Sequence, residues 1–428
     1  MSVDTIREVL EYSDIAGYEI TDTKIRGWEF YLIRHKLDQN RVKEVEHIQV
    51  KVFRSLEEGK YLGSAKTEIS PTAGKEEIKA AIERLTEQAS YVKNPAYTLN
   101  NRVNFLEAES KPIDVSAIAK DFLEAAKSVP ETDTEDINSY EIFVNEIERR
   151  IINSEGIDYT VKYPDSMMEV VVNARRDGHE IELYRMYHSG TCDKASLVHD
   201  ITETMKFGKD RLLCEPTPKL GTYAVLFSTD AVLSIYRNYY LERMSAGYKF
   251  MGYSDFEIGK PVTQDAEGDK VTLYALHELP NSSRNFLFDE EGALIRDRCL
   301  IRNNNPETFF GSRQFSQYLN LEHSSLVYNY SVEGGSKSAA ELRKGDYLEV
   351  VEFSDFQCDA ITGDIAGEIR LAYWHHDGVT VPVSGGSVSG SMKDLSKHMY
   401  LSKETRQYDT AVVPAVTRLE GVKITGVK

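Results

Sequence analysis

The chain has 428 residues, of which 41% are hydrophobic and 28% are charged, so it is long enough for two or three globular units. Its formal net charge of -18 would repel a phosphate backbone, which argues against direct nucleic-acid binding. No run approaches the roughly 20 apolar residues of a transmembrane helix, and the first residues lack the basic and apolar segments of a secretory signal. We therefore expect a cytoplasmic protein that does not bind membranes.

The first predicted unit, residues 1–95, combines strands with one helix. Apolar and polar residues alternate around 28–32 and again around 48–52, as is typical of half-buried strands. Apolar residues then recur at helical spacing over 78–92, and Asn94-Pro95 supplies a stop signal. These patterns predict a small α/β unit.

A second α/β unit, a helix plus a β-meander, is predicted for residues 110–215, after an aperiodic connection at 96–114. Within it, the dipeptide Asp177-Gly178 separates two strand-like runs and suits the positive φ angles of a two-residue hairpin turn. The predicted elements are a helix at 118–129, strands at 168–175 and 179–187, and a closing helix at 195–213.

The third predicted unit, residues 220–428, is rich in short strands and turns. A strand at 223–227 leads into a helix at 230–244. Turn signals then follow at 290–292, between two strand-like runs, and at Asp377-Gly378. The chain as a whole is predicted to be an α+β protein, with N-terminal α/β units followed by a β-rich C-terminal domain.

The sequence offers no recognisable catalytic motif. None of the ten histidines forms HExxH or HExxxH, the helical motifs in which two histidines reach one metal ion and a glutamate activates its water. The four cysteines form no CxxC pair, and neither a GxSxG elbow nor a GxxxxGK[ST] phosphate loop occurs. We therefore predict no catalytic residues and no metal ligands in this chain.

Several ordered segments of the C-terminal third resemble the TldD/PmbA family. Residues 224–231 are similar to the family's entry into its last domain, and 359–364 are similar to its NPVTGDF stretch. The other similar segments are an asparagine-containing turn at 302–305, a run at 374–390, and the ending at 414–426. Weaker similarities at 61–64 and 152–156 extend the resemblance over most of the chain.

The resemblance implies two kinds of subunit. One is similar to a zinc peptidase, with HExxxH on the helix that opens the last domain and a cysteine further along. This chain has no histidine between His199 and His277 and no cysteine after Cys358, so it resembles the second kind, which lacks the zinc motif. That kind pairs with the zinc-bearing one around a peptide, so zinc is expected only in a partner subunit.

The hypothesis from sequence is thus a non-catalytic subunit that, with a zinc-bearing homologue, binds and degrades or matures unfolded peptides. Such peptides would be added as strands to an exposed sheet edge. The resemblance suggests five candidate residues for binding a peptide or a partner: Asn303, Asn304, Thr362, Gly363 and Asp364. A homo-oligomeric peptide-binding protein without a peptidase partner stays open as an alternative, as does a hydrolase with an unrecognised nucleophile.

Overall fold

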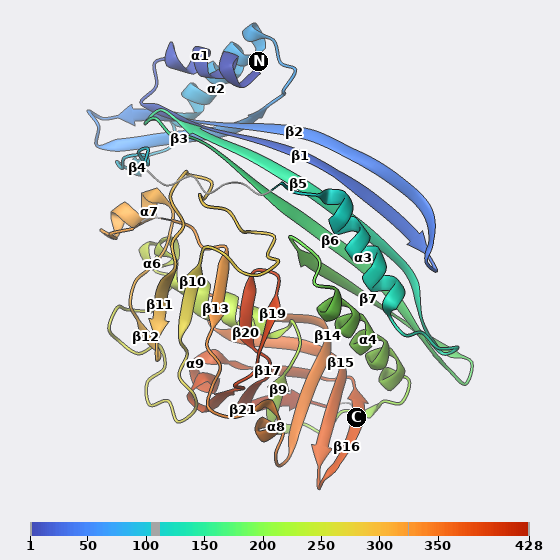
Figure 1. Ribbon diagram of the computed structural model, residues 1–428. Coiled ribbons are helices and arrows are strands. Elements are labelled where there is room, and N and C mark those ends of the chain that lie inside the picture. Colours follow the sequence, from blue (N-terminus) through green and yellow to red (C-terminus); the bar gives the residue numbers. More distant parts are fainter. Residues whose placement is uncertain (1, 104–111, 324, 427–428) are drawn as a thin grey trace.

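The computed structural model describes residues 2–103, 112–323 and 325–426. A long curved sheet lies across a second, more compact part that is rich in strands (Figure 1). This architecture confirms the predicted α+β class. Part of the expected connection at 96–114, and the expected start of the second unit at residue 110, lie outside the described residues.

The long sheet is antiparallel and contains both N-terminal units. Its order is β4-β3-β2-β1-β5-β6-β7, and β1 pairs with β5 over the whole stretch from Glu19 to Ile33. The two predicted α/β units therefore share one sheet. Its strands are β1 (Gly17–Ile33), β2 (Lys36–Leu56), β3 (Tyr61–Ile69), β4 (Asn94–Pro95), β5 (Glu135–Asn153), β6 (Asp158–Arg176) and β7 (His179–Ser189).

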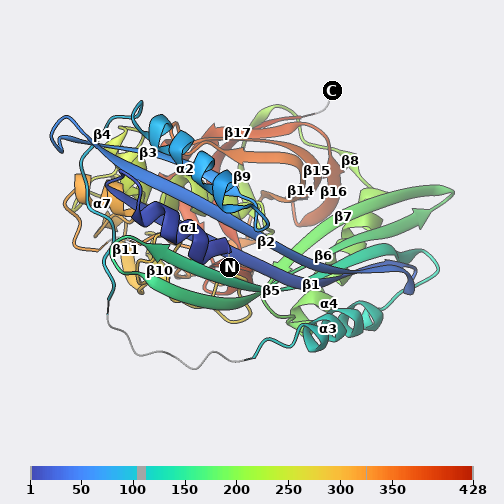
Figure 2. The ribbon, with the colours of Figure 1, turned by 90° about the horizontal axis from the view of Figure 1, so that it is seen from above.

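Four helices cover two ends of this sheet (Figure 2). The helices α1 (Ser2–Glu11) and α2 (Lys75–Ala89) cover one end, and α3 (Val115–Ser128) and α4 (Lys194–Arg211) cover the other. Side chains of β5 serve both cores, because Ile152 packs under α2 whereas Ile142 packs under α3 and α4. Ten residues separate these two isoleucines, so they share a face of the strand.

The two predicted hairpin turns are confirmed. Asp177 and Gly178 have φ angles of 50° and 80° between β6 and β7, and Asp377 and Gly378 have 49° and 76°. Positive φ at both central residues defines the type I′ turn, which suits the right-handed twist of the flanking strands.

The C-terminal part contains two further sheets. One has the order β12-β11-β10-β13-β20-β19. In the other, the strands β14, β9, β21, β17 and β15 close into a ring, because β14 also pairs with β15.

The strands of the C-terminal part are β8 (Glu215–Pro216), β9 (Gly221–Phe227), β10 (Leu273–Leu276), β11 (Arg298–Arg302), β12 (Asn305–Pro306), β13 (Asn329–Val332), β14 (Tyr347–Cys358), β15 (Asp364–His376), β16 (Val379–Ser384), β17 (Ser387–Ser391), β18 (Met399–Leu401), β19 (Thr405–Tyr408), β20 (Ala411–Pro414) and β21 (Thr417–Thr425). Its helices are α5 (Val232–Ser234), a π-helix (Ile235–Leu241), a 3₁₀-helix (Glu242–Met244), α6 (Ala246–Phe250), α7 (Arg313–Tyr318), α8 (Ala339–Leu342), α9 (Met392–Leu395) and a second 3₁₀-helix (Ser396–His398).

Two local expectations differ from the structure. The helix predicted at 230–244 forms as a short α-turn, a π-helix and a 3₁₀-turn in succession. The strand-like runs expected on either side of 290–292 are reduced to one isolated bridge between Phe288 and Leu294. In the described ranges, no helix combines the length and the apolarity that crossing a membrane requires.

Candidate functional site

A cleft separates α4 and β7 of the long sheet from the C-terminal part. It contains a cavity of about 440 Å³ beside β7 and a second of about 1040 Å³ beside β14 and β16. Both cavities are lined by Asp200 and Glu203 of α4 and by Arg406 of β19, which lie where the two cavities meet. We call the two cavities together the interdomain cleft.

Residues of α4 reach the cleft because that helix is amphipathic. Asp193 caps its first turn by accepting a hydrogen bond from the backbone N–H of Ser196 at 3.1 Å. Leu197 and Ile201 are buried against the long sheet, and the opposite side of the helix then carries Asp200 and Glu203. The spacing that builds the core thus places two carboxylates in the cleft.

Arg406 joins the two walls of the cleft. Its Nη2 donates to Asp200 Oδ1 at 2.7 Å, and its Nη1 donates to Glu203 Oε2 at 3.2 Å. Burial alone would lower the pKa of Arg406, but Tyr408, Asp200 and Glu203 raise it above its usual value. The guanidinium is therefore a fixed positive charge held by carboxylates of the other domain.

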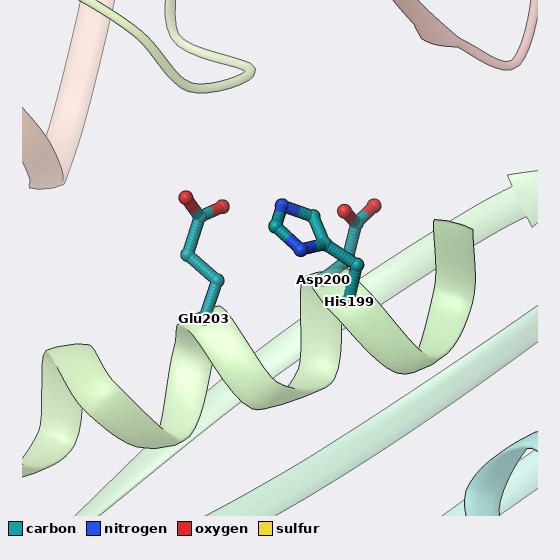
Figure 3. Close-up of side chains that lie close together, drawn as sticks. All are labelled: His199, Asp200 and Glu203. Carbon is teal, nitrogen blue, oxygen red and sulfur yellow. The ribbon is translucent and has the colours of Figure 1, made fainter. Parts of the chain in front are cut away.

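His199 completes a group of possible metal ligands with the same carboxylates (Figure 3). Ligand atoms of His199, Asp200 and Glu203 all lie within 4.8 Å of one another. Arg406, however, already hydrogen-bonds one oxygen of each carboxylate, and its charge would repel a divalent cation placed between them. The group therefore does not fit a resident metal ion while Arg406 is in place.

The helical segment at 232–244 forms part of the opposite wall. Arg237 lines the smaller cavity, whereas Tyr236, Tyr239 and Tyr240 are fully buried in the C-terminal core. Asn238 uses its Nδ2 to donate to the carbonyl of Cys358 at 2.9 Å. The segment expected to carry zinc ligands in a peptidase-type subunit thus presents Leu233 and Arg237 to the cavity, and its tyrosines serve packing.

The thiol in the cleft is not activated. Burial raises the pKa of Cys192 to about 12, so this side chain carries a protonated thiol at neutral pH. Burial also raises the pKa of Tyr187, whose hydroxyl lies 3.2 Å from Thr204 Oγ1. Neither group has the depressed pKa that a nucleophile needs.

Open sheet edges border the smaller cavity on two sides. β7 ends the long sheet and β19 ends the six-stranded sheet. Five consecutive residues of β7, from Arg185 to Ser189, line the cavity, as do Arg406, Gln407 and Tyr408 of β19. Successive side chains of a strand point to opposite faces, so a cavity lined by consecutive residues adjoins the strand's edge.

The candidate residues suggested by the sequence lie outside both cavities. Asn303 and Asn304 form the turn between β11 and β12, with φ angles of 48° and 66°. Asn304 is buried, and its Oδ1 accepts from the backbone N–H of Val271 at 2.7 Å. Asn304 therefore fixes the turn, and Asn303 is exposed at its tip.

The other three candidates form the turn between β14 and β15. Thr362 and Asp364 are exposed, whereas Gly363 is buried with φ +81°. A Cβ atom on Gly363 would lie 2.8 Å from the ring of Tyr239, so only glycine fits there. The structure does not bring this turn to the interdomain cleft, and its role in binding a peptide or a partner stays a prediction.

The cleft residues were missed in the sequence for a physical reason. Arg406 lies more than 200 positions after its partners Asp200 and Glu203, and no local period connects them. The one sequence feature that pointed to the cleft was the spacing of Asp200 and Glu203 on the polar side of the predicted helix at 195–213.

Comparisons with known proteins define the class of this fold. Residues 220–426 match the family model described as the PmbA/TldA metallopeptidase C-terminal domain. TldE from Thermococcus kodakarensis shares the fold with 17% identity and a TM-score of 0.78, covering 99% of this chain and 100% of its own. No curated protein matches the chain by sequence.

Two other solved structures have the same fold over nearly their full length. A proposed modulator of a DNA gyrase from Thermotoga maritima is 16% identical with a TM-score of 0.75, covering 99% of this chain and 98% of its own. A proposed modulator of DNA gyrase from Bacteroides thetaiotaomicron is 15% identical, also with a TM-score of 0.75, and covers 99% of each chain. Residues 220–426 of this chain thus form the C-terminal domain of the PmbA/TldD family model, and the whole chain has the fold of these three structures.

Proposed function

We propose that this chain is the metal-free subunit of a TldD/PmbA-type metallopeptidase complex. It binds unfolded peptides in the interdomain cleft and presents them to a homologous subunit that carries zinc. The complex acts in the cytoplasm, where it degrades peptides or matures them. The similarity of the whole fold to TldE supports this assignment.

The observation that carries the proposal is the position of Arg406. Its guanidinium hydrogen-bonds Asp200 and Glu203, the two carboxylates in the group of side chains that could hold a metal ion. A carboxylate that already pairs with a guanidinium is a weaker ligand, and the like charge of a second cation adds repulsion. The cleft therefore keeps a binding geometry while lacking the chemistry of a peptidase.

The sheet edges at the cleft support an extended peptide as the ligand. An edge strand offers a row of backbone N–H and C=O groups, which an added strand can pair with regardless of its side chains. Here β7 and β19 present such edges to the same cavity. Main-chain pairing suits unfolded substrates of varied sequence.

The test is hydrolysis of an unfolded peptide by this chain, by a zinc-bearing homologue, and by both mixed, each with and without a chelator. We expect no turnover by this chain alone and chelator-sensitive turnover by the mixture. Chelator-resistant cleavage by the lone chain would favour a hidden nucleophile. Failure of the mixture to associate or to cleave would favour the homo-oligomeric peptide-binding protein.

Strand addition has its own test, which uses one peptide in two N-methylated forms. Methyl groups on alternate residues remove alternate backbone N–H donors, and only one set of donors faces a given neighbouring strand. Loss of binding in one form indicates pairing with one edge, and loss in both indicates pairing with β7 and β19 together. Equal binding of both forms and of the unmethylated peptide would contradict strand addition.

A further inference from the structure

Another pocket shares no lining residue with the interdomain cleft and lies where β11 meets the loops that follow β4 and α7. It has a volume of about 260 Å³, well above the ~10–15 Å³ that one water needs. Arginines at 296, 298 and 313 line it together with His323, and Glu322 is the one acidic residue in its wall among the described residues. A basic pocket is unexpected in a chain with a net charge of -18.

Arg298 is the most important residue of this pocket, because two of its three guanidinium nitrogens have no hydrogen-bond partner among the described residues. Its Nη2 donates to Ser325 Oγ at 2.9 Å, which fixes the direction of the side chain. Its Nε and Nη1 are buried, and neither has a hydrogen-bond partner in the described part of the chain. Buried donors without acceptors are rare, because each costs the free energy of its lost hydration.

The buried carboxylate of Asp289 does not supply the missing acceptors. Asp289 Oδ1 accepts from the backbone N–H groups of Glu291 and Ala293, and its Oδ2 accepts from that of Leu326 at 2.9 Å. All of these hydrogen bonds go to backbone groups, and none goes to Arg298. Asp289 therefore acts on Arg298 through its charge alone and leaves the Arg298 donors without acceptors.

The other two arginines add positive charge to the same space. Arg313 is held by Thr98, whose carbonyl accepts from its Nε at 3.2 Å. Arg296 is exposed and makes no ion pair with any described residue. Three arginines that line one pocket repel one another unless a negative charge lies between them.

We propose that the pocket formed by Arg296, Arg298, Arg313 and His323 binds a small oxyanion, a phosphate or a carboxylate. Such an anion offers several acceptor oxygens to planar guanidinium groups, which recognise it with charge-assisted hydrogen bonds. It would neutralise the positive charges that line the pocket, and its contact with Arg298 Nε or Nη1 requires the side chain to move, because both atoms are buried. This site is separate from the cleft and does not depend on the function proposed for it.

Titration calorimetry with inorganic phosphate and with acetate, at constant ionic strength, tests the site on the full chain. We expect saturable binding of at least one anion, and the tighter of the two identifies the group that the pocket prefers. Arg298→Gln should weaken that binding by about tenfold or more, because it removes a charged donor. Arg296→Gln should weaken it by a smaller factor and, being exposed, leaves the fold intact.

The matched control is Arg302→Gln, which makes the same charge change on the same strand but outside the pocket. Arg302 is exposed and already pairs with Glu307 at 2.6 Å. Its substitution should leave anion binding unchanged. The proposal is overturned if neither anion binds saturably at millimolar concentrations, or if Arg302→Gln weakens binding as much as Arg296→Gln does.

Discussion

The long sheet and the C-terminal part meet at two junctions of opposite character. At one, aromatic rings interlock: Tyr159 stacks on Phe288 with ring centroids 4.1 Å apart, and Tyr163 lies against Phe286 at 4.8 Å. At the other, the interdomain cleft, cavities flank a cluster of charged hydrogen bonds around Arg406, and Glu352 of β14 forms ion pairs with Arg185 and Arg211 of the long-sheet part. We call them the apolar junction and the polar junction. Both junctions hold the two parts together, since Val351 and Leu371 pack into the core of α3 and α4, but only the polar junction leaves room for a ligand.

Removing a buried ring from the apolar junction should give the largest loss of stability. Phe288 is 2% exposed, so Phe288→Ala removes a buried ring and leaves a cavity. We expect a loss of about 3–5 kcal/mol in the free energy of unfolding, measured by urea titration. The control Val42→Ala changes an exposed side chain on β2 and should cost less than about 0.5 kcal/mol. A similar cost for both variants would refute the assigned role of this junction.

A substitution at Gly292 tests how tightly the same junction is packed. Its φ is +73°, and an added Cβ would lie 2.7 Å from Ile157 Cδ1, so Gly292→Ala combines backbone strain with a clash. Gly378 has a similar φ of +76° but open space around it. Gly378→Ala should cost about 1–2 kcal/mol from backbone strain alone. Gly292→Ala should lower the free energy of unfolding, measured by thermal or urea unfolding, by about 1–3 kcal/mol more than Gly378→Ala does. Equal losses would mean that Ile157 moves aside without cost.

The polar junction should contribute less to stability. Arg406→Ala leaves Asp200 and Glu203 without their shared partner, but these side chains are 22% and 31% exposed, so water can reach them. We expect a loss of about 1–3 kcal/mol in the free energy of unfolding. Arg237→Ala is the control, because Arg237 also lines the cleft yet is 68% exposed. A loss for Arg406→Ala that exceeds the loss for Phe288→Ala would reverse the comparison.

The stability of the apolar junction should also depend on pH. Burial raises the pKa of Glu291 from 4.5 to about 7, so the folded state favours the protonated acid. The resulting stabilisation is complete below pH 4.5 and is lost as the pH rises through 7, at no more than about 1.4 kcal/mol per pH unit. Glu291→Gln should therefore flatten the fall in melting temperature between pH 5 and pH 8. An unchanged slope in the variant would assign the pH dependence to other groups.

How far the sequence predicted this molecule depends on how local each signal is. The strands and helices of the long sheet were predictable because alternation and helical spacing persist over many residues, as in β6 and α4. The two type I′ turns were predictable from Asp-Gly pairs. The π-helix at Ile235–Leu241 was not, because its register depends on packing of Tyr236, Tyr239 and Tyr240 in the tertiary core.

The candidate site was less predictable than the fold. The absence of paired helical histidines could be read directly, and it led to the metal-free hypothesis. The contact between Arg406 and the carboxylates of α4 could not, because it forms only when β19 reaches the cleft from the far end of the chain. Ion pairs between distant segments leave no periodic trace in a single sequence.

The central claim is that Arg406, and not a metal ion, is the cation that Asp200 and Glu203 hold in the interdomain cleft. The most direct measurement is elemental analysis of the purified chain after incubation with zinc and extensive dialysis. Our account predicts no stoichiometric zinc in the wild-type chain, because Arg406 already occupies Asp200 and Glu203. One zinc per chain, lost on substitution of His199 by alanine, would contradict it.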